Sequence, residues 1–384
     1  MGTIGKYQDA LIPARDGVRI LRQLAESSPE PDARYFLTIA LNNLGRRHAK
    51  LEQTQAAAEV FQEGLSILRI LLGSRANNRD LELLRETLKE LSVVLPQLGK
   101  TQDLLAEQQA TLSILSLAAK TQPMFQDAVA DIQVSLGDTY SKLGRFSEAQ
   151  SSHREALEIL RDQAIGRGDR RFVLKTTLNK LMLVNIELGQ LDSLKSIWSE
   201  MLPIVESELL EARKNESRDL PSRQILALSL MELMIVHNQL GQSVQSLHAA
   251  EEAMPLIREI IKADPANKWW QSQQVDVLKI IASSYLESGH TQKIVAISEE
   301  LFPLLREVAK TDPSKREELV FFLVSLGKLY GLGLDTNLQF KPYFQEALTM
   351  ISSDLPSLRQ QAGTRPVAAG RVPSRGVKPE ARMP

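Results

Sequence analysis

The sequence predicts an all-α protein, a right-handed superhelical solenoid of six to seven stacked helix pairs. Apolar residues recur at three- and four-residue spacing, which is typical of one buried stripe of a helix rather than of the alternation of a strand. The clearest run is Leu81, Leu84, Leu88, Leu91 and Leu95. Such runs end at glycines that return at spacings of 45, 45, 52 and 48 residues, namely Gly99, Gly144, Gly189, Gly241 and Gly289. A fixed period of this kind indicates stacked repeats.

The first segment, residues 1–32, contains one helical pattern before the repeats begin. Residues 7 to about 26 form this pattern, and a solenoid needs its end repeats covered. We therefore expect a capping helix there, followed by a solenoid over residues 33–356.

Each repeat is predicted to be a first helix, a tight glycine turn, a second helix and a short polar loop. Glu52 takes the turn position 47 residues before Gly99, and the Gly331–Asp335 stretch takes it after Gly289. Glycine and proline stop one helix, and the neighbouring Asp, Ser or Asn can cap the next.

The best copy of the repeat carries small and large residues in a fixed order. It contains Leu136-Gly137, Tyr140, Leu143-Gly144, Phe146, Ala149 and Ala156-Leu157. A second copy has Leu44-Gly45 with Ala57, Phe61 and Leu65, and a third has Leu326-Gly327 with Tyr330. This pattern resembles the tetratricopeptide repeat, in a variety longer than the usual 34 or so residues. HEAT repeats share the longer period, and the glycine between the two helices favours the tetratricopeptide kind.

Three prolines divide the predicted array into two halves. Pro203, Pro255 and Pro303 each lie 14 residues after the turn glycine of their own repeat. Proline removes a backbone donor and clashes with the preceding helical turn, so we expect the second helix to bend at all three places. The alternative is that each proline marks the end of the second helix.

The last segment, residues 357–384, differs in composition from the rest. It is rich in proline and glycine and holds six basic residues against the single acid Glu380. We expect a disordered tail, with an electrostatic tether to an acidic partner as the alternative.

The composition argues against several classes of partner. The 46 basic and 47 acidic residues give a net charge of −1, whereas a nucleic-acid binder needs a basic surplus. No apolar run is long enough to span a membrane, and the start lacks the apolar core of a secretion signal. Cysteine is absent, which excludes disulfides and thiolate sites. We expect a cytoplasmic protein without cofactor or metal.

The resemblance implies that the first helices line a concave groove. The residues that face it lie 13, 10, 6 and 3 positions before each turn. In repeats four and five these are mostly apolar, so we predict a partner-binding surface made of Asn179, Leu183, Ile186, Leu228, Met231, Ile235 and Asn238. A peptide or amphipathic helix would dock there. The alternatives are that this face is packed core, or that it mediates self-association into a homo-oligomer.

A second set of groove residues is basic or amide-bearing. Asn42, Arg46, Lys50 and Lys89 resemble the clamp with which some family members hold a C-terminal carboxylate. Glu86 lies among them and weakens the positive field. The full clamp pattern is not reproduced.

Enzyme signatures are missing from the sequence. The five histidines are scattered without metal-ligand spacing, and no phosphate loop or GxSxG motif occurs. We therefore expect a non-enzymatic scaffold or adaptor for a protein partner. The alternative is a sensor module in which a bound peptide or ligand changes the superhelix and controls an effector.

Overall fold

The computed structural model describes residues 8–28, 30–75, 77–214 and 219–310, and residues 316, 318–325, 341–342, 345–346, 348–350 and 352. Within these residues the chain forms helices and turns and no strand. The predicted tail 357–384, the Leu326-Gly327 copy with Tyr330 and the Gly331–Asp335 turn lie outside them.

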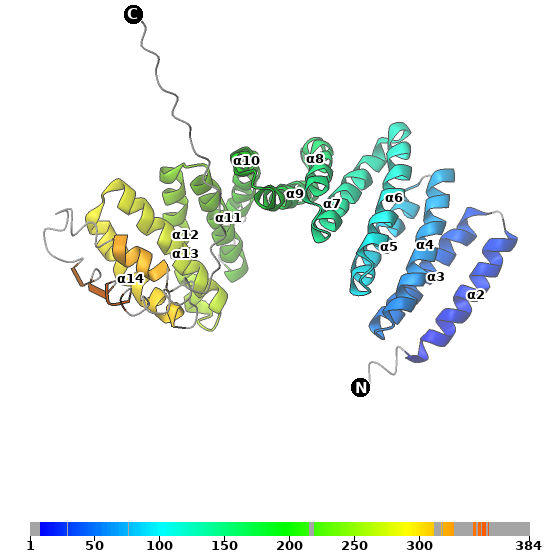
Figure 1. Cartoon of the computed structure of the whole chain (residues 1–384), viewed down its shortest axis with the longest axis horizontal. Coiled ribbons are helices and arrows are strands. Elements are labelled where there is room, and N and C mark those ends of the chain that lie inside the picture. Colours follow the sequence, from blue (N-terminus) through cyan, green and yellow to red (C-terminus); the bar gives the residue numbers. More distant parts are fainter. Residues whose placement is uncertain are drawn as a thin grey trace, which may run out of the picture. The chain divides into compact units, whose positions relative to one another are not determined.

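Consecutive helices pack together as antiparallel neighbours over residues 11–187 and again over residues 220–309 (Figure 1). α2 (Leu11–Ser27) comes first. The next pairs are α3 (Pro31–Lys50) with α4 (Thr54–Arg75), α5 (Asn78–Gln97) with α6 (Thr101–Thr121), and α7 (Gln126–Lys142) with α8 (Phe146–Gln163). The last pairs are α9 (Gly168–Glu187) with α10 (Leu194–Lys214), α11 (Leu220–Gln239) with α12 (Ser243–Ala263), and α13 (Lys268–Ser288) with α14 (Thr291–Ala309). Short 3₁₀ turns, η1 (Pro123–Phe125) and η2 (Leu191–Ser193), precede α7 and α10. The all-α repeat architecture is confirmed.

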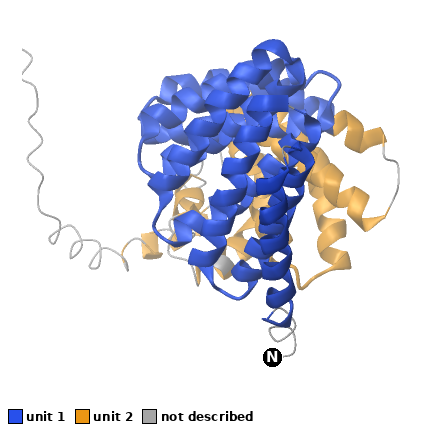
Figure 2. Ribbon diagram, turned by 90° about the vertical axis from the view of Figure 1, so that its right-hand side faces the viewer, with its two compact units in different colours: residues 1–208 blue, residues 209–384 orange. Residues whose placement is uncertain are grey.

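The chain forms two compact units, residues 1–208 and 209–384 (Figure 2). The boundary lies inside α10, the second helix of repeat four, shortly after Pro203. In unit 1 the buried apolar residues of α4 to α8 form the largest cluster, and in unit 2 those of α11 to α14 form one cluster.

Every pair is closed by the same turn. In all six repeats the residue after the turn position donates its N–H to the carbonyl five residues earlier, for example Arg145 to Tyr140 at 2.9 Å and Gln242 to His237 at 2.8 Å. The turn residue itself donates to the carbonyl three residues earlier, as Gly144 does to Ser141. This is the hydrogen-bond pattern of a Schellman motif, which requires a left-handed residue just after the helix.

The turn residues adopt that conformation at the predicted positions. The five turn glycines have φ between 68° and 74°, and Glu52 has φ 58°. Among the described residues, Glu52 is the single non-glycine with positive φ. Its assignment as a turn residue from spacing alone is therefore confirmed.

In three repeats a small residue of one helix lies at the level of a large residue of the other, seven positions before the turn and nine positions after it. In repeats one and three a glycine faces a ring: a Cβ on Gly45 would overlap Phe61, and a Cβ on Gly137 would overlap His153. In repeat five the sizes are reversed, with Met234 before the turn and Ala250 after it, both buried. Repeats four and six differ, with Met182 and Trp198 in the former and Ala282 and Ser298 in the latter, so each pair fills this level in its own way.

The three prolines lie inside continuous helices. α10, α12 and α14 run through Pro203, Pro255 and Pro303, respectively. The alternative that each proline ends its helix is therefore wrong, because the flanking turns of helix supply enough hydrogen bonds to bridge one missing donor. The bend at each proline stays a prediction.

Ion pairs join the second helices of successive repeats. Arg69 pairs with Glu107, Arg161 with Glu200 at 2.7 Å and Arg258 with Glu300, while Arg306 of α14 binds Glu346, which follows the last described pair. All four arginines lie seventeen residues after their turn residue. Pairs that are partly exposed contribute at most about 1 kcal/mol each, so they fix the register of the repeats more than they stabilise them.

The turn conformation gives a first prediction. Replacing Glu52 by glycine removes the strain of a side chain in the left-handed region, so Glu52→Gly should raise the free energy of unfolding by roughly 0.5–1 kcal/mol. Gly144→Glu is the reverse change in the equivalent turn and should lower it by a similar amount. Urea denaturation of both variants measures the effect. A loss of stability in Glu52→Gly would contradict the assignment.

The buried His153 gives a second prediction. The side chain is 1% exposed, and its pKa is lowered to about 4, by burial first, with Asp138 acting in the opposite direction. The unfolded chain therefore binds a proton between about pH 6.5 and 4 that the folded chain does not, and stability falls as the pH falls through this window. The loss should reach about 2 kcal/mol between pH 7.5 and 5.

The variant His153→Phe should remove that loss. Repeat one already has Phe61 at this level opposite Gly45, so a phenyl ring fits opposite Gly137. Urea denaturation at pH 7.5 and 5 should show a flatter dependence than in the wild type, whereas the exposed His248→Phe should leave it unchanged. Equal slopes in all three proteins would show that His153 does not set the acid sensitivity.

Candidate protein-binding surfaces

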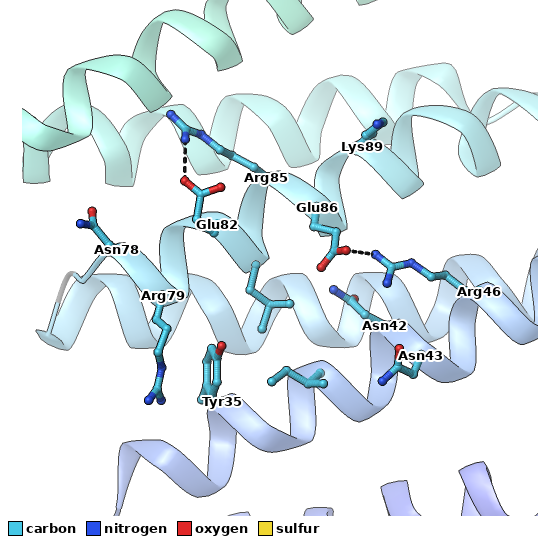
Figure 3. A pocket seen from close by; sticks show the side chains of 12 residues that line it. Tyr35, Asn42, Asn43, Arg46, Asn78, Arg79, Glu82, Arg85, Glu86 and Lys89 are labelled. Carbon is cyan, nitrogen blue, oxygen red and sulfur yellow. Dashed lines mark hydrogen bonds and ion pairs between the residues drawn. The ribbon is translucent and has the colours of Figure 1, made fainter. Parts of the chain in front are cut away.

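A cavity of about 830 Å³ opens between the first helices of repeats one and two, α3 and α5 (Figure 3). Its lining includes predicted groove residues from both helices. The lining residues are Tyr35, Ile39, Asn42, Asn43 and Arg46 on α3, and Asn78, Arg79, Glu82, Leu83, Arg85, Glu86 and Lys89 on α5. Charged and amide side chains therefore dominate this part of the groove.

Most cations of this cavity are already paired. Arg46 binds Glu86, and its Nε donates to Glu90 at 2.8 Å; Figure 3 shows the pair with Glu86. Burial lowers the pKa of Arg46, but the hydrogen bonds to the two carboxylates outweigh it and the net shift is upward. Arg85 binds Glu82 at 2.8 Å and Asp131 of α7 at 3.0 Å. The positive charges that would attract an anion are thus largely neutralised by carboxylates of the protein itself.

A further arginine lies at the end of the same cavity. Arg79 stacks on the ring of Tyr35, 4.0 Å from its centroid, and binds Asp32 at 3.1 Å. The aromatic ring and the carboxylate hold the guanidinium from two sides, which fixes the N-terminal end of α5 against α3.

The structure brings together three of the four residues predicted to bind a carboxylate. Asn42, Arg46 and Lys89 line the cavity, whereas Lys50 is exposed and does not. Asn42 is buried, and its Nδ2 donates to Thr87 at 2.8 Å, so it ties α3 to α5. Among the residues that the structure describes, Lys89 forms no ion pair. The carboxylate site stays a prediction, and among the cations that line the cavity Lys89 is the one without an ion pair to a described residue.

In unit 1 the predicted apolar groove residues lie on the exposed face of α9. Leu183 is 60% exposed and Ile186 46%, and Asn179 is half-buried. Phe172, which the sequence analysis did not single out, is 64% exposed. Thr176, Asn179, Leu183 and Ile186 follow Phe172 by four, seven, eleven and fourteen positions, so all five residues lie on one face of the helix. We call this set the α9 stripe.

In unit 2 the predicted residues divide between surface and core. Leu228 and Ile235 are 42% and 43% exposed, and Asn238 is exposed. Met231 is 6% exposed and belongs to the core cluster of α11 to α14. Ile225, one turn before Leu228, is also exposed. The α11 surface therefore consists of Ile225, Leu228, Ile235 and Asn238, and Met231 supports it from beneath.

Two residues of these surfaces were missed by counting back from the turn. Phe172 and Ile225 lie 17 and 16 residues before their turn glycines, beyond the four positions considered. The signal that finds them is the helical spacing itself, since Phe172 lies eleven residues before Leu183 on the same face.

A smaller cavity of about 370 Å³ lies in unit 2 next to α13. Lys279, Ile280, Ser283, Glu318, Phe321 and Phe322 line it. Lys279 binds Asp276 and Glu318, each at 2.7 Å, while Phe321 is exposed at the rim. Here too the cation is neutralised by neighbouring carboxylates.

The described residues form neither a cluster of metal ligands nor a membrane-spanning helix. Within the described part of the chain, no three His, Asp or Glu side chains gather as metal ligands would. Nor does any helix in that part combine the length and apolarity needed to cross a membrane.

Two stretches of the chain match family models for the tetratricopeptide repeat, residues 38–80 and 134–165. They cover the turns at Glu52 and Gly144, and so contain the two repeats in which a glycine faces a ring. Comparison with curated proteins gave no match.

Several solved structures are similar in fold at low identity. BtubC (BKLC) from P. vanneervenii is 17% identical with a TM-score of 0.42, covering 66% of this chain and 92% of that chain. A putative kinesin light chain from Podosopora anserina, with nearly identical TPR-like repeats, is 18% identical with a TM-score of 0.40, covering 62% and 99%. A tetratricopeptide repeat protein from Parabacteroides merdae is 15% identical with a TM-score of 0.31, covering 81% and 98%. With TM-scores below 0.5, these likenesses carry no argument about binding.

The paired state of Arg46 gives a third prediction. Arg46→Ala should lower the free energy of unfolding by about 1 kcal/mol, because it separates two carboxylates of α5 from their shared partner on α3. Lys89→Ala, in the same cavity, should change it by less than about 0.5 kcal/mol. Urea denaturation of both variants compares them. If Arg46→Ala is as neutral as Lys89→Ala, Arg46 is free to serve as a ligand-binding cation.

Proposed function

We propose that this chain, two stretches of which match tetratricopeptide-repeat models, acts as a non-enzymatic adaptor that binds an apolar segment of a protein partner. Tetratricopeptide repeats generally mediate interactions between proteins rather than catalysis. The observation that carries the proposal is the α9 stripe. Four of its five residues, Thr176, Asn179, Leu183 and Ile186, are at the positions expected to face the family's groove, and its three large apolar side chains are about half exposed or more. A set of exposed apolar residues on one face is a usual signature of a binding surface.

Comparison of equivalent positions within the chain supports this choice. Six residues before the turn, repeats one and three have Arg46 and Asp138, which are engaged in ion pairs. Repeats two, four and five have Val93, Leu183 and Ile235 at the same position, and all three are exposed. What favours contact with a partner in repeat four is that Leu183 is joined on the same face by the exposed Phe172 and Ile186.

The proposed partner is an amphipathic helix or an extended apolar peptide. The stripe extends from Phe172 to Ile186, which at 1.5 Å per residue is about 21 Å. That length matches about four turns of a docked helix, with anchors at the spacing of a helix-in-groove complex. The α11 surface is a second candidate of the same character in unit 2.

The fourth prediction separates the two surfaces. Leu183→Glu/Ile186→Glu and Leu228→Glu/Ile235→Glu place charges on exposed positions and should leave the fold intact. In pull-downs with quantitative mass spectrometry, specific partners should decrease by at least about tenfold in the variant whose surface binds them. Met231 stays unchanged because its substitution would disturb the core.

Matched controls come from exposed apolar residues outside the groove. Leu117→Glu on α6 and Val244→Glu on α12 add the same charge to units 1 and 2, respectively, at positions that are more exposed. Circular dichroism checks the fold, and light scattering checks whether any variant changes the oligomeric state. Partners retained by both groove variants but lost by a control would overturn the proposal.

A further inference from the structure

The sequence around α2 repeats that of the second helices. The sequence Gly5-Lys6-Tyr7 comes shortly before α2. The similar sequence Gly144-Arg145-Phe146 leads into α8, which begins at Phe146. With the same offset, Ala10, Leu21, Arg22 and Ala25 correspond to Ala149, Leu160, Arg161 and Ala164. The offset that aligns α2 with α4 likewise matches Gly17 with Gly64 and Arg22 with Arg69. The residues of α2 thus have the sequence register of a second helix.

The contacts of α2 agree with this register. Arg22 binds Glu63 of α4 through two hydrogen bonds, of 3.0 and 2.8 Å. Arg161 and Arg258, its equivalents, bind Glu200 and Glu300 of the next second helix in the same way, and Arg69 binds Glu107 through one nitrogen. Leu11, Val18 and Ala25 are buried against α3. α2 therefore takes the place of the second helix of a repeat that precedes α3.

The face that a first helix covers in the other repeats is open in α2. In α4 that face consists of Ala57, Phe61, Gly64, Leu68 and Leu71, all buried against α3. The equivalents in α2 are Ala10, Ala14, Gly17, Leu21 and Leu24. Leu24 is 48% exposed, and the other four are partly exposed. Ile20, 57% exposed, extends the same apolar face.

The two glycines show the difference most directly. A Cβ on Gly64 would lie 3.4 Å from Thr38 and 3.8 Å from Leu41, both on the first helix of its repeat. A Cβ on Gly17 would meet no atom within 4 Å. Within the described residues, the position that Thr38 fills beside Gly64 is empty beside Gly17.

We propose that this open face of α2 binds an amphipathic α-helix from a partner, which takes the place of a first helix. The interface would continue the helix–helix packing that is already established inside the other repeats. Ala14 is equivalent to Ala250 of α12, and the buried Met234 of α11 lies at the level of Ala250 in repeat five. A helix with the sequence of α11 would therefore place a methionine at the level of Ala14, and we choose it as the test ligand.

The test uses the full chain and a synthetic peptide with the sequence of residues 220–239, acetylated, amidated and labelled with fluorescein. Fluorescence anisotropy should show saturable binding. The same peptide with the residue equivalent to Met234 replaced by glycine should bind roughly tenfold more weakly or worse, since it buries a whole side chain less. Hydrogen exchange should slow at α2 when the first peptide is added.

Variants of the chain locate the peptide. Gly17→Glu adds a side chain where the free protein has open space, so it should fold and should weaken binding at least about tenfold. Gln23→Glu adds the same charge on another side of α2 and should bind as the wild type does. Leu24→Glu is the second variant of the face, used if Gly17→Glu does not fold. Leu183→Glu/Ile186→Glu should have no effect, which separates this site from the α9 stripe.

Three outcomes overturn the proposal. No saturable binding up to about 1 mM peptide means that the face takes no helix. Binding that survives both Gly17→Glu and Leu24→Glu places the peptide elsewhere. A doubled mass in light scattering without peptide, reduced to the single-chain mass by Gly17→Glu, shows that a second copy of the chain covers the face instead.

Discussion

The structure depends on one backbone constraint, the left-handed residue between the two helices of each repeat. An L-residue with a side chain resists positive φ, because its Cβ approaches the following carbonyl oxygen. Glycine avoids this, and the Schellman hydrogen bonds then reverse the chain within a few residues. Since every pair is closed by the same hydrogen bonds, every second helix returns along its first helix with the same register. The equivalence of positions between repeats follows from this.

That register determines which side chains meet within a pair. The turn fixes which residue of the second helix lies at the level of which residue of the first, and in repeats one, three and five a small residue there accommodates a large one. Phe61 with Gly45 and His153 with Gly137 meet this condition in one direction, and Met234 with Ala250 in the other. It also explains the ion pairs of the second helices, whose arginines and glutamates recur at positions set by the distance from the turn.

The residues expected to face the groove are of two kinds, charged side chains that form ion pairs and apolar side chains that are exposed. Some charged residues of adjacent first helices neutralise each other, as Arg46 does with Glu86 and Glu90, and Lys180 with Asp138. On α5, α9 and α11 the positions equivalent to Arg46 and Asp138 hold the exposed apolar residues Val93, Leu183 and Ile235. The α2 face is apolar and open for another reason: the helix register calls for a neighbour that the described residues do not supply.

The sequence by itself determined the helices, the turns and the repeat. A three- and four-residue apolar period specifies a helix, and glycine at a fixed spacing specifies a left-handed turn, so even Glu52 could be placed in a turn from its distance to Gly99. Both signals depend on residues that are near one another along the chain, so they can be recognised without knowing the fold.

Only the tertiary structure decided which apolar side chains are covered and which charges are free. α11 is apolar nearly all round, so nothing in its sequence distinguishes the buried Met231 from the exposed Leu228 and Ile235. In the sequence Arg46 could be a ligand-binding cation. The fold brings Glu90, 44 positions further along the chain, to 2.8 Å from its Nε, so the charge of Arg46 is already paired. Likewise, the sequence predicts that α2 is a capping helix. Comparison with α4, whose equivalent face is covered by α3, shows that this face of α2 is open. Burial and pairing depend on neighbours that are distant in sequence, which is why helix positions could be predicted and binding surfaces could not.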